Sequence, residues 1–134
     1  MPRSLHAFGS HATQITHRQS AVALEVIDER AFADSVTDPW FNQTLCAVND
    51  SVVRIGIVKG EYHWHKHDND DEFFYVVEGE LLIDLEERTV SLGPRQAMVV
   101  PKGVVHRTRA PERTVMLMVE TRSIVPTGEP QPSS

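Results

Sequence analysis

The sequence predicts an all-β domain whose strands close into a sandwich or barrel. From about residue 43 onward, short runs rich in Val, Ile, Phe and Leu follow one another at intervals of roughly ten residues. The residues between these runs favour tight turns and include Asn49-Asp50, Lys59-Gly60, Glu78-Gly79, Gly93-Pro94 and Pro111-Glu112. Because connections this short cannot hold a crossover helix, we expect neighbouring strands to be antiparallel.

The length and composition indicate one folded domain. With 134 residues the chain can enclose a single hydrophobic core. Apolar residues make up 40% of the chain and charged residues 24%, far from the composition of disordered proteins. The net charge of −6, without a run rich in Lys or Arg, argues against a nucleic acid partner.

The compartment is predicted from two further properties. No apolar stretch approaches the ~20 residues that cross a bilayer, and the first residues lack the apolar core of a secretion signal. We therefore expect no membrane partner and a cytoplasmic location. The single cysteine, Cys46, excludes an intrachain disulfide and is expected to act as a small buried hydrophobe.

Three segments are expected along the chain. Residues 1–42 form an N-terminal arm with the first strand, residues 43–125 form the barrel, and residues 126–134, PTGEPQPSS, form a flexible tail. Within the arm, VALEV (22–26) alternates like a strand, whereas IDERAFADS (27–35) fits one or two helical turns that begin near Asp28.

A cluster of histidines points to metal binding. His63, His65 and His67 lie on one face of an extended segment, about 6.6 Å apart, so two imidazoles can lean toward a common ion. The acidic turn DNDD follows, and Glu72 then opens the next strand, where it can lie across from the pair. A carboxylate beside two neutral imidazoles suits a divalent ion. His106, just after the turn PKGVV, is the fourth candidate ligand.

These residues resemble the two motifs of the cupin superfamily. GEYHWHKHDNDDEFFYVVEG is similar to the first motif, G-x5-H-x-H-x3,4-E-x6-G, and GPRQAMVVPKGVVHRTRA is similar to the second, G-x5-P-x-G-x2-H-x3-N. The resemblance spans residues 60–110 and implies a single-domain jelly-roll β-barrel. It also implies that the metal ligands are His65, His67, Glu72 and His106.

The match to the motifs has three departures, none of which removes a ligand. Gly60 precedes His65 by one residue too few, and Gly93 precedes Pro101 by two residues too many. Ala110 replaces the final asparagine.

The ligand set that the resemblance implies would hold one divalent transition metal, Fe, Mn, Ni or Zn, and leave one or two open coordination positions. Cupins include dioxygenases, isomerases, epimerases, decarboxylases, storage proteins and sensors, so the fold does not fix the reaction. We expect a metal-dependent enzyme that acts on a small organic substrate, with dioxygenase chemistry first and isomerase or lyase chemistry next. The alternative is a non-catalytic module that binds or senses a small molecule.

The role of His63 depends on the register of the histidines. A shifted register would let His63 and His65 bind the ion in place of His65 and His67, but the spacing to Glu72 would then leave the motif. In the expected register His63 points into the same cavity, and we predict a catalytic role for it, with simple packing as the alternative.

Three further expectations concern charged and apolar segments. Residues 68–71 form either a second cation site or a solvated turn, and the turn is favoured. Arg54 could reach an anionic substrate, although a strand arginine is more often exposed to solvent. We also expect a homodimer that pairs through the exposed apolar run TVMLMVE (114–120) or through the N-terminal arm.

Overall fold

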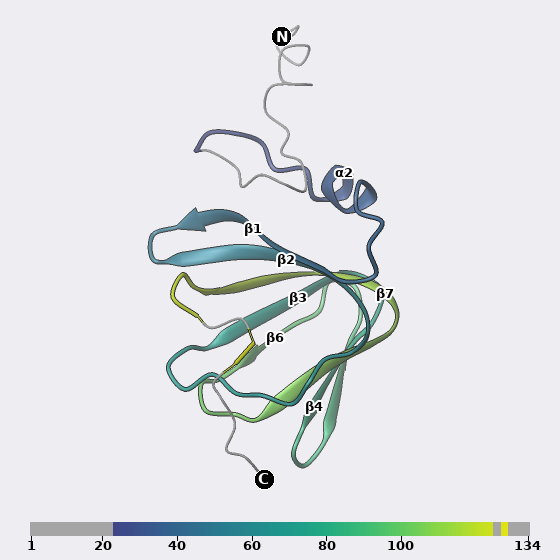
Figure 1. The fold of residues 1–134 in the computed structure, drawn as a ribbon, viewed down its shortest axis with the longest axis vertical. Helices are drawn as coiled ribbons and strands as arrows, with labels where there is room; N and C mark the ends of the chain where they lie inside the picture. Colours follow the sequence, from purple (N-terminus) through teal and green to yellow (C-terminus); the bar gives the residue numbers. More distant parts are fainter. Residues whose placement is uncertain (1–22, 125–126, 129–134) are drawn as a thin grey trace, which may run out of the picture.

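The fold is an antiparallel β-barrel with one short helix packed against one end of its sheet (Figure 1). The computed structural model describes residues 23–124 together with Thr127 and Gly128. Its elements are α2 (Glu29–Asp34), β1 (Phe41–Val48), β2 (Ser51–Glu61), β3 (Glu72–Glu78), β4 (Leu81–Leu85), β5 (Thr89–Leu92), β6 (Ala97–Val100) and β7 (His106–Thr121). The all-β class is confirmed, whereas most of the arm (1–22) and of the tail expected to be flexible (126 and 129–134) lies outside the described residues.

Helix α2 forms where one or two helical turns were expected. Asp28 caps the helix, because its Oδ1 accepts a hydrogen bond of 2.9 Å from the backbone N–H of Ala31. Phe32 and Ala33 are buried against the sheet. A helix of six residues is not stable alone, so this burial holds it in place. In the described part of the chain, no helix has the length and apolar character needed to cross a membrane.

The strand interpretation of VALEV is wrong for residues 23–26, which form a turn followed by coil. Leu24 has a positive φ of 72° and is fully exposed, and Val26 is 61% exposed. Alternation produces a strand only where a sheet edge accepts its hydrogen bonds, and residues 23–26 join no ladder within the described residues. Val22 lies outside the described residues.

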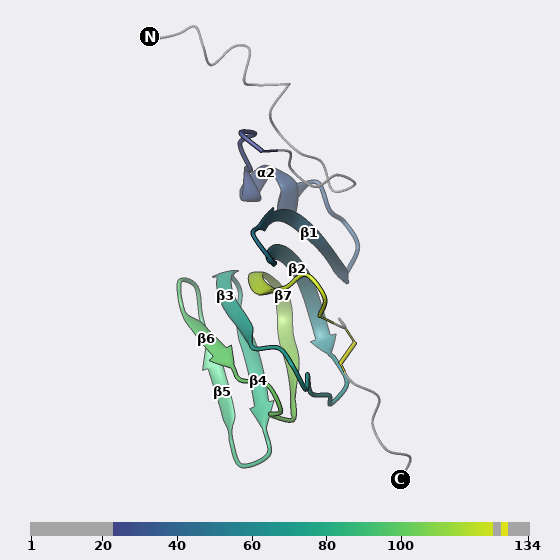
Figure 2. The ribbon, with the colours of Figure 1, turned by 90° about the vertical axis from the view of Figure 1, so that its left-hand side faces the viewer.

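Strand β7 lies at the centre of the sheet, between β2 and β3 (Figure 2). The paired strands follow the order β1-β2-β7-β3-β6, and β4 joins β7 and β5. The run TVMLMVE belongs to β7 and pairs on both sides, so the expectation that it forms an exposed edge is wrong. Its side chains cover both faces: Met116 and Met118 join the barrel interior, and Val115 joins the cluster next to α2.

The turns predicted at Lys59-Gly60 and Pro111-Glu112 are also wrong, because β2 continues through the first and β7 through the second. Val58 of β2 pairs with Thr114, and Gly60 pairs with Ala110, so three residues of β7, 111–113, lie opposite the single residue Lys59. This bulge lets the ladder continue although Pro111 has no N–H to donate.

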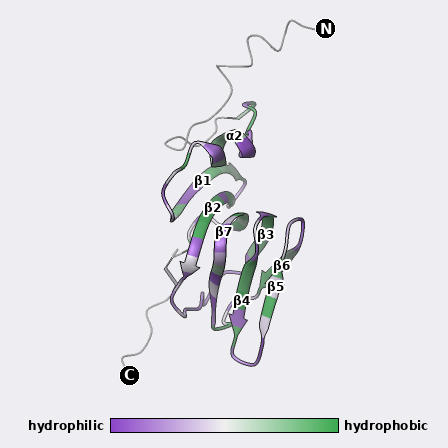
Figure 3. Ribbon diagram, turned by 90° about the vertical axis from the view of Figure 1, so that its right-hand side faces the viewer, coloured by the Kyte–Doolittle hydropathy of each residue, from purple (hydrophilic) through white to green (hydrophobic). Residues whose placement is uncertain are grey.

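Strand β2 separates two hydrophobic clusters. Val58 faces the barrel interior, where it packs with Phe74 and Met116, whereas Ile55 and Ile57 pack with residues of α2. Gly56 lies on the interior side, and a Cβ there would come within 2.9 Å of Met116 Cε. Hydrophobic residues are concentrated in the strands (Figure 3). Burial of one cluster stabilises the barrel interior, and burial of the other stabilises the contact between the sheet and the helix.

Candidate metal centre

The segment after β2 carries two of the predicted ligands and is held by backbone hydrogen bonds rather than by a full strand. His65 and His106 form an isolated antiparallel bridge, in which each backbone N–H donates to the other's carbonyl oxygen at 2.9 Å. Gly103 N–H donates to His67 O at 2.7 Å. The extended strand expected for residues 63–67 is therefore reduced to one bridge, which places His65 directly opposite His106.

The four predicted ligands come together in the barrel interior. His65, His67, Glu72 and His106 are all buried, with exposed fractions of 1–7%. One ligand atom from each lies within 4.8 Å of those of the other three. Glu72 Oε1 is 3.3 Å from His106 Nε2 and 3.5 Å from His67 Nε2. Two donors that each bind one ion at about 2.0–2.2 Å lie about 3.0–3.5 Å apart, so these distances fit a shared ion.

The backbone fixes which nitrogen two of the rings present to the site. His65 Nδ1 lies 2.9 Å from His63 O, and His106 Nδ1 lies 2.9 Å from Val104 O. A carbonyl oxygen only accepts hydrogen bonds, so each Nδ1 carries the proton and each Nε2 keeps a lone pair. Both rings therefore offer Nε2 as a metal ligand.

Unpartnered polar atoms test whether a metal fits. Glu72 Oε1, His106 Nε2 and both ring nitrogens of His67 are buried, and none of them has a hydrogen-bond partner among the described residues. Leaving such groups unpaired is costly in a hydrophobic core. A divalent ion bound by these atoms would remove that cost, so the residues fit the metal that the sequence predicts.

Burial and neighbouring side chains together set the protonation states that metal binding needs. It lowers the pKa of His65 to about 4, so this imidazole is neutral at neutral pH. Burial raises the pKa of Glu72, but the surrounding His106, His67 and Glu120 outweigh it and leave the pKa well below its ordinary value. Neutral imidazoles and an ionised carboxylate are the metal-binding forms of these side chains.

The remaining candidates from the sequence lie outside the ligand cluster. His63 is exposed, and its Nε2 donates to Thr127 O at 2.9 Å. Its catalytic role stays a prediction. Of residues 68–71, Asp70 accepts from Thr121 Oγ1 and Asp71 accepts from Lys102 N–H, as expected for a turn. Arg54 is mostly covered, with 19% of its side chain exposed.

A cavity of about 180 Å³ lies beside the ligand cluster. His65 and Glu72 form part of its wall, and Met116 and Met118 form part of its apolar lining. Tyr62 also lines it, and burial together with the Glu72 carboxylate raises the pKa of its phenol. The tyrosine therefore keeps its proton at neutral pH and remains a hydrogen-bond donor.

Glu120, a buried carboxyl group next to Glu72, was not predicted from the sequence. Burial and the Glu72 carboxylate raise the pKa of Glu120 to about 8, although the positive charge of Arg54 favours the ionised form and lowers this pKa. Glu120 follows Met116 and Met118 at a spacing of two residues, which places it on the interior face of β7. An acidic residue on the inward face of an apolar strand was the signal that could have identified it.

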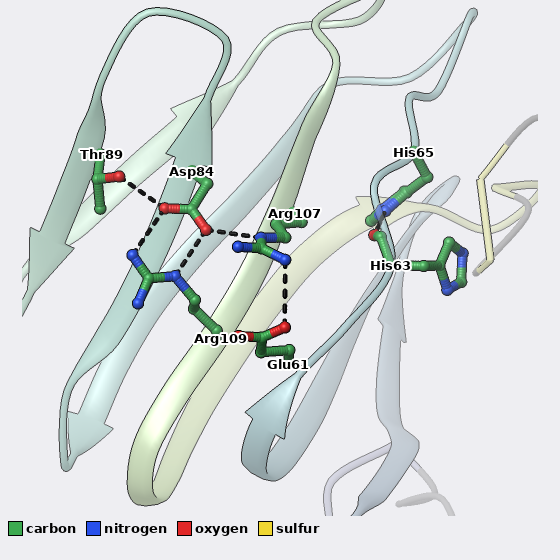
Figure 4. Close-up of polar contacts among 7 residues, drawn as sticks. All are labelled: Glu61, His63, His65, Asp84, Thr89, Arg107 and Arg109. Atoms are coloured by element: carbon green, nitrogen blue, oxygen red, sulfur yellow. Dashed lines mark hydrogen bonds and ion pairs between the residues drawn. The ribbon is translucent and has the colours of Figure 1, made fainter.

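An ion-pair network on the outside of the barrel supports the strand that carries His106. Figure 4 shows Asp84 of β4 bonded to Thr89, Arg107 and Arg109, with Arg107 in turn bonded to Glu61. Asp84 Oδ2 accepts from Arg109 Nε at 2.6 Å and from Arg107 Nε at 2.8 Å. The network ties β4 to β7 at the residues directly after His106.

Comparison with known proteins identifies the family. Residues 53–121 match the cupin domain (Cupin_2). The protein named "Uncharacterized protein YdbB" of Bacillus subtilis (strain 168) is 46% identical over 91 residues, which cover 67% of this chain and 80% of that protein.

Two solved structures are similar in fold. A cupin-2 domain containing protein from Shewanella frigidimarina NCIMB 400 has a TM-score of 0.70 and 31% identity, and the match covers 72% of this chain and 95% of that one. Protein NMB1881 from Neisseria meningitidis has a TM-score of 0.66 and 22% identity, over 72% and 99% of the two chains. The matched family region includes His65, His67, Glu72 and His106, and the chain belongs to the cupin family.

Proposed function

We propose that this chain is a metal-dependent enzyme that acts on a small organic molecule, with dioxygenase chemistry first and isomerase or lyase chemistry next. One observation carries the proposal: His65 and Glu72 belong both to the ligand cluster and to the wall of the cavity. A molecule in the cavity would therefore lie beside the ligand set.

The four ligands His65, His67, Glu72 and His106 would hold one divalent ion, Fe, Mn, Ni or Zn. Such an ion supplies Lewis acidity and, if it is iron, chemistry with dioxygen. The chain's own residues would bind and orient the substrate. Tyr62 can donate a hydrogen bond to a bound molecule, and the apolar lining excludes water.

The order of the reactions follows from the acid and base groups of the cavity. Apart from His65 and Glu72, no histidine or carboxylate lines it in the described part of the chain. Isomerases and lyases that move a proton to or from carbon need a positioned acid or base. His63 lies next to Tyr62, with ring centroids 4.2 Å apart, but it is not part of the lining. Dioxygen chemistry at iron depends less on a positioned acid or base, so we rank dioxygenase chemistry above isomerase and lyase chemistry.

Oxygen uptake by reconstituted protein tests the proposal. Chelator-treated protein is loaded with Fe(II) or Mn(II) and assayed with catechols, diketones and 2-oxo acids. We expect uptake with at least one class, lost in Glu72→Gln and His106→Gln and kept in the matched control Glu86→Gln, an exposed residue after β4. A fully loaded protein that converts no compound of the panel would contradict an enzymatic role.

A non-catalytic binding module is the second candidate, and the shortage of acid and base groups in the cavity favours it. Calorimetry followed by mass spectrometry separates the two functions. A ligand that binds reversibly and is recovered unchanged supports binding, and recovery of a product supports catalysis.

We further propose a cytoplasmic homodimer. The sheet path ends at β1 and β6, and these strands expose Val48 and Val99, which favours pairing at one of these edges. Analytical ultracentrifugation is expected to give twice the chain mass of 15.1 kDa. A monomer at micromolar concentration would contradict the dimer.

A further inference from the structure

The cavity beside the metal ligands contains a cation that the ligand set does not use. Arg54 of β2 lines this cavity together with Asn42 and Tyr62. We propose that Arg54 anchors a carboxylate of the substrate, and that the substrate class is a small carboxylate with a planar apolar body. The inference rests on the proposed function for what happens to the bound molecule, but anion binding by Arg54 can be tested on its own.

The position of Arg54 on its strand directs it into the barrel. Arg54 pairs with Met118, and Gly56 pairs with Met116, on the face that also carries Val58. Side chains two residues apart on a strand point to the same side. Arg54 thus shares the interior face with the apolar lining and does not follow the more common pattern of a solvent-exposed strand arginine.

Two neutral side chains of β1 hold the guanidinium in place. Nε donates to Asn42 Oδ1 at 2.7 Å, and Nη1 donates to Thr44 Oγ1 at 2.7 Å. These two bonds fix the plane of the group, whereas Nη2 makes no hydrogen bond within the described residues. A fixed plane with free N–H groups is the arrangement that recognises a carboxylate.

The positive charge of Arg54 is incompletely balanced by the protein. Glu120 Oε1 lies 3.4 Å from Arg54 Nε, which is longer than the about 2.7–2.9 Å of a charge-assisted hydrogen bond. Nε already donates to Asn42, so Glu120 does not form a two-pronged pair with the guanidinium. A mostly covered arginine favours a close anion, and a substrate carboxylate would provide it.

The orientation of Asn42 adds a second donor to the same wall. Arginine cannot accept a hydrogen bond, so the Asn42 atom that faces Arg54 Nε must be the amide oxygen. The amide nitrogen of Asn42 is then left as a donor. The hydroxyl of Tyr62 lines the same cavity, so Arg54, Asn42 and Tyr62 provide donors in its wall, which suits a ligand with acceptor atoms, whereas Glu72 and His65 belong to the ligand cluster.

The rest of the cavity limits the size and shape of the ligand. Its volume of about 180 Å³ is below the about 300–1,000 Å³ of typical ligand pockets, so it suits a small molecule. Trp40, Phe74 and the methionines Met116 and Met118 supply aromatic and thioether surface. Such surface favours a flat apolar body over a sugar or a flexible chain. Benzoate has this size, shape and charge and serves as the probe.

Calorimetry with benzoate and its neutral analogue benzamide tests the inference, on Zn(II)-loaded and on chelator-treated full-length protein. We expect benzoate to bind at least about tenfold more tightly than benzamide to the wild type. Arg54→Met should remove this preference, and Arg88→Met, an exposed arginine between β4 and β5, should keep it. The chelator-treated arm separates anchoring by Arg54 from direct binding of benzoate to the metal.

A second variant covers the case in which Arg54→Met does not fold. Asn42→Asp places a carboxylate beside Nε, which neutralises the guanidinium without removing it, and should weaken benzoate binding by about tenfold. Equal affinity for benzoate and benzamide, or an unchanged preference in Arg54→Met or Asn42→Asp, would overturn the inference even if the metal binds. Arg54-dependent benzoate binding in a protein that takes up no metal would support the anion site and count against the metal-dependent function.

Discussion

Gly128 packs directly against His65, although the two residues are 63 positions apart in the chain. A Cβ added to Gly128 would lie 2.6 Å from His65 Cβ and 2.7 Å from His65 Cδ2. Gly128 also has a φ of +84°, which glycine adopts without strain. Thr127 O accepts a hydrogen bond from His63 Nε2, so Thr127 and Gly128 both contact the segment that carries the predicted metal ligand His65.

Gly128→Ala is therefore expected to weaken metal binding, because the methyl group would push His65 away from the other ligands. We expect a loss of affinity of at least about tenfold, similar to the loss of a group that orients a ligand. Gly60→Ala is the matched control, since Gly60 has a φ of +96° but no neighbour within 4 Å of the added Cβ. Competition with a fluorescent chelator measures both affinities. Equal affinities would show that the contact with His65 is unimportant.

Gly79→Ala should destabilise the fold without acting on the metal site directly. A Cβ at Gly79 would lie 2.8 Å from Arg113 O and 2.8 Å from Thr114 Cα, and backbone atoms cannot move aside easily. We expect a loss of about 3 kcal/mol in the free energy of unfolding, as for other overpacked sites. Gly103→Ala, with a φ of +83° and no neighbour within 4 Å, should lose only the smaller cost of backbone strain. Urea denaturation of both variants decides whether the contact or the φ angle dominates.

Asp84→Asn should reduce stability at neutral pH, because Asp84 is bonded to both Arg107 and Arg109. The expected loss is on the order of 1 kcal/mol, since both arginine partners of the buried Asp84 are partly exposed to solvent. Hydrogen bonding from Arg109 is the main reason that the pKa of Asp84 lies well below its ordinary value of 3.8. For a carboxyl group with a lowered pKa, the stabilisation is complete above the unfolded-state pKa and is lost as the pH falls below it.

The difference between wild type and Asp84→Asn should accordingly be constant above about pH 5 and shrink below about pH 4. Denaturation of both proteins between pH 3 and pH 7 measures it. A difference that does not change with pH would mean that the charge of Asp84 contributes nothing to the network.

The stability of the metal-free protein should also depend on His65. Burial lowers the pKa of His65 to about 4 in the fold, against its ordinary value of 6.5 in the unfolded chain. Between these pH values the unfolded chain binds the proton and the fold does not, so stability rises as the pH rises from 4 to 6.5. The contribution is at most about 1.4 kcal/mol per pH unit.

His65→Gln removes this titration, so its unfolding free energy should rise less steeply over the same range. Chelator-treated wild type and variant are compared by denaturation at three pH values, with His63→Gln as the control for an exposed neighbour. Parallel curves for wild type and His65→Gln would contradict a lowered pKa at this residue.

The sequence was sufficient to predict the strand-rich fold and the grouping of the four ligands. The alternation of apolar residues marks the strands, the spacing of His65, His67 and Glu72 matches one known motif, and the second motif adds His106. The cap of α2 at Asp28 is local, since one side chain and one backbone N–H create it.

The features that were not predicted depend on residues distant in sequence. The position of β7 at the sheet centre requires knowledge of its partners on both sides. Pro111-Glu112 has the composition of a turn, and only the bulge opposite Val58 and Gly60 allows the strand to continue. His63 follows the same alternation as His65, but the ladder that would enforce it contains a single bridge.

The two-sided packing of β2 has a consequence for how this protein can change. Residues 54, 56 and 58 face the barrel interior and its cavity, whereas residues 55 and 57 pack against helix α2. Substitution of Arg54, which lines the cavity and belongs to neither hydrophobic cluster, can therefore alter ligand preference while the scaffold stays intact. A one-residue slip of the strand would exchange the two sets and damage both at once.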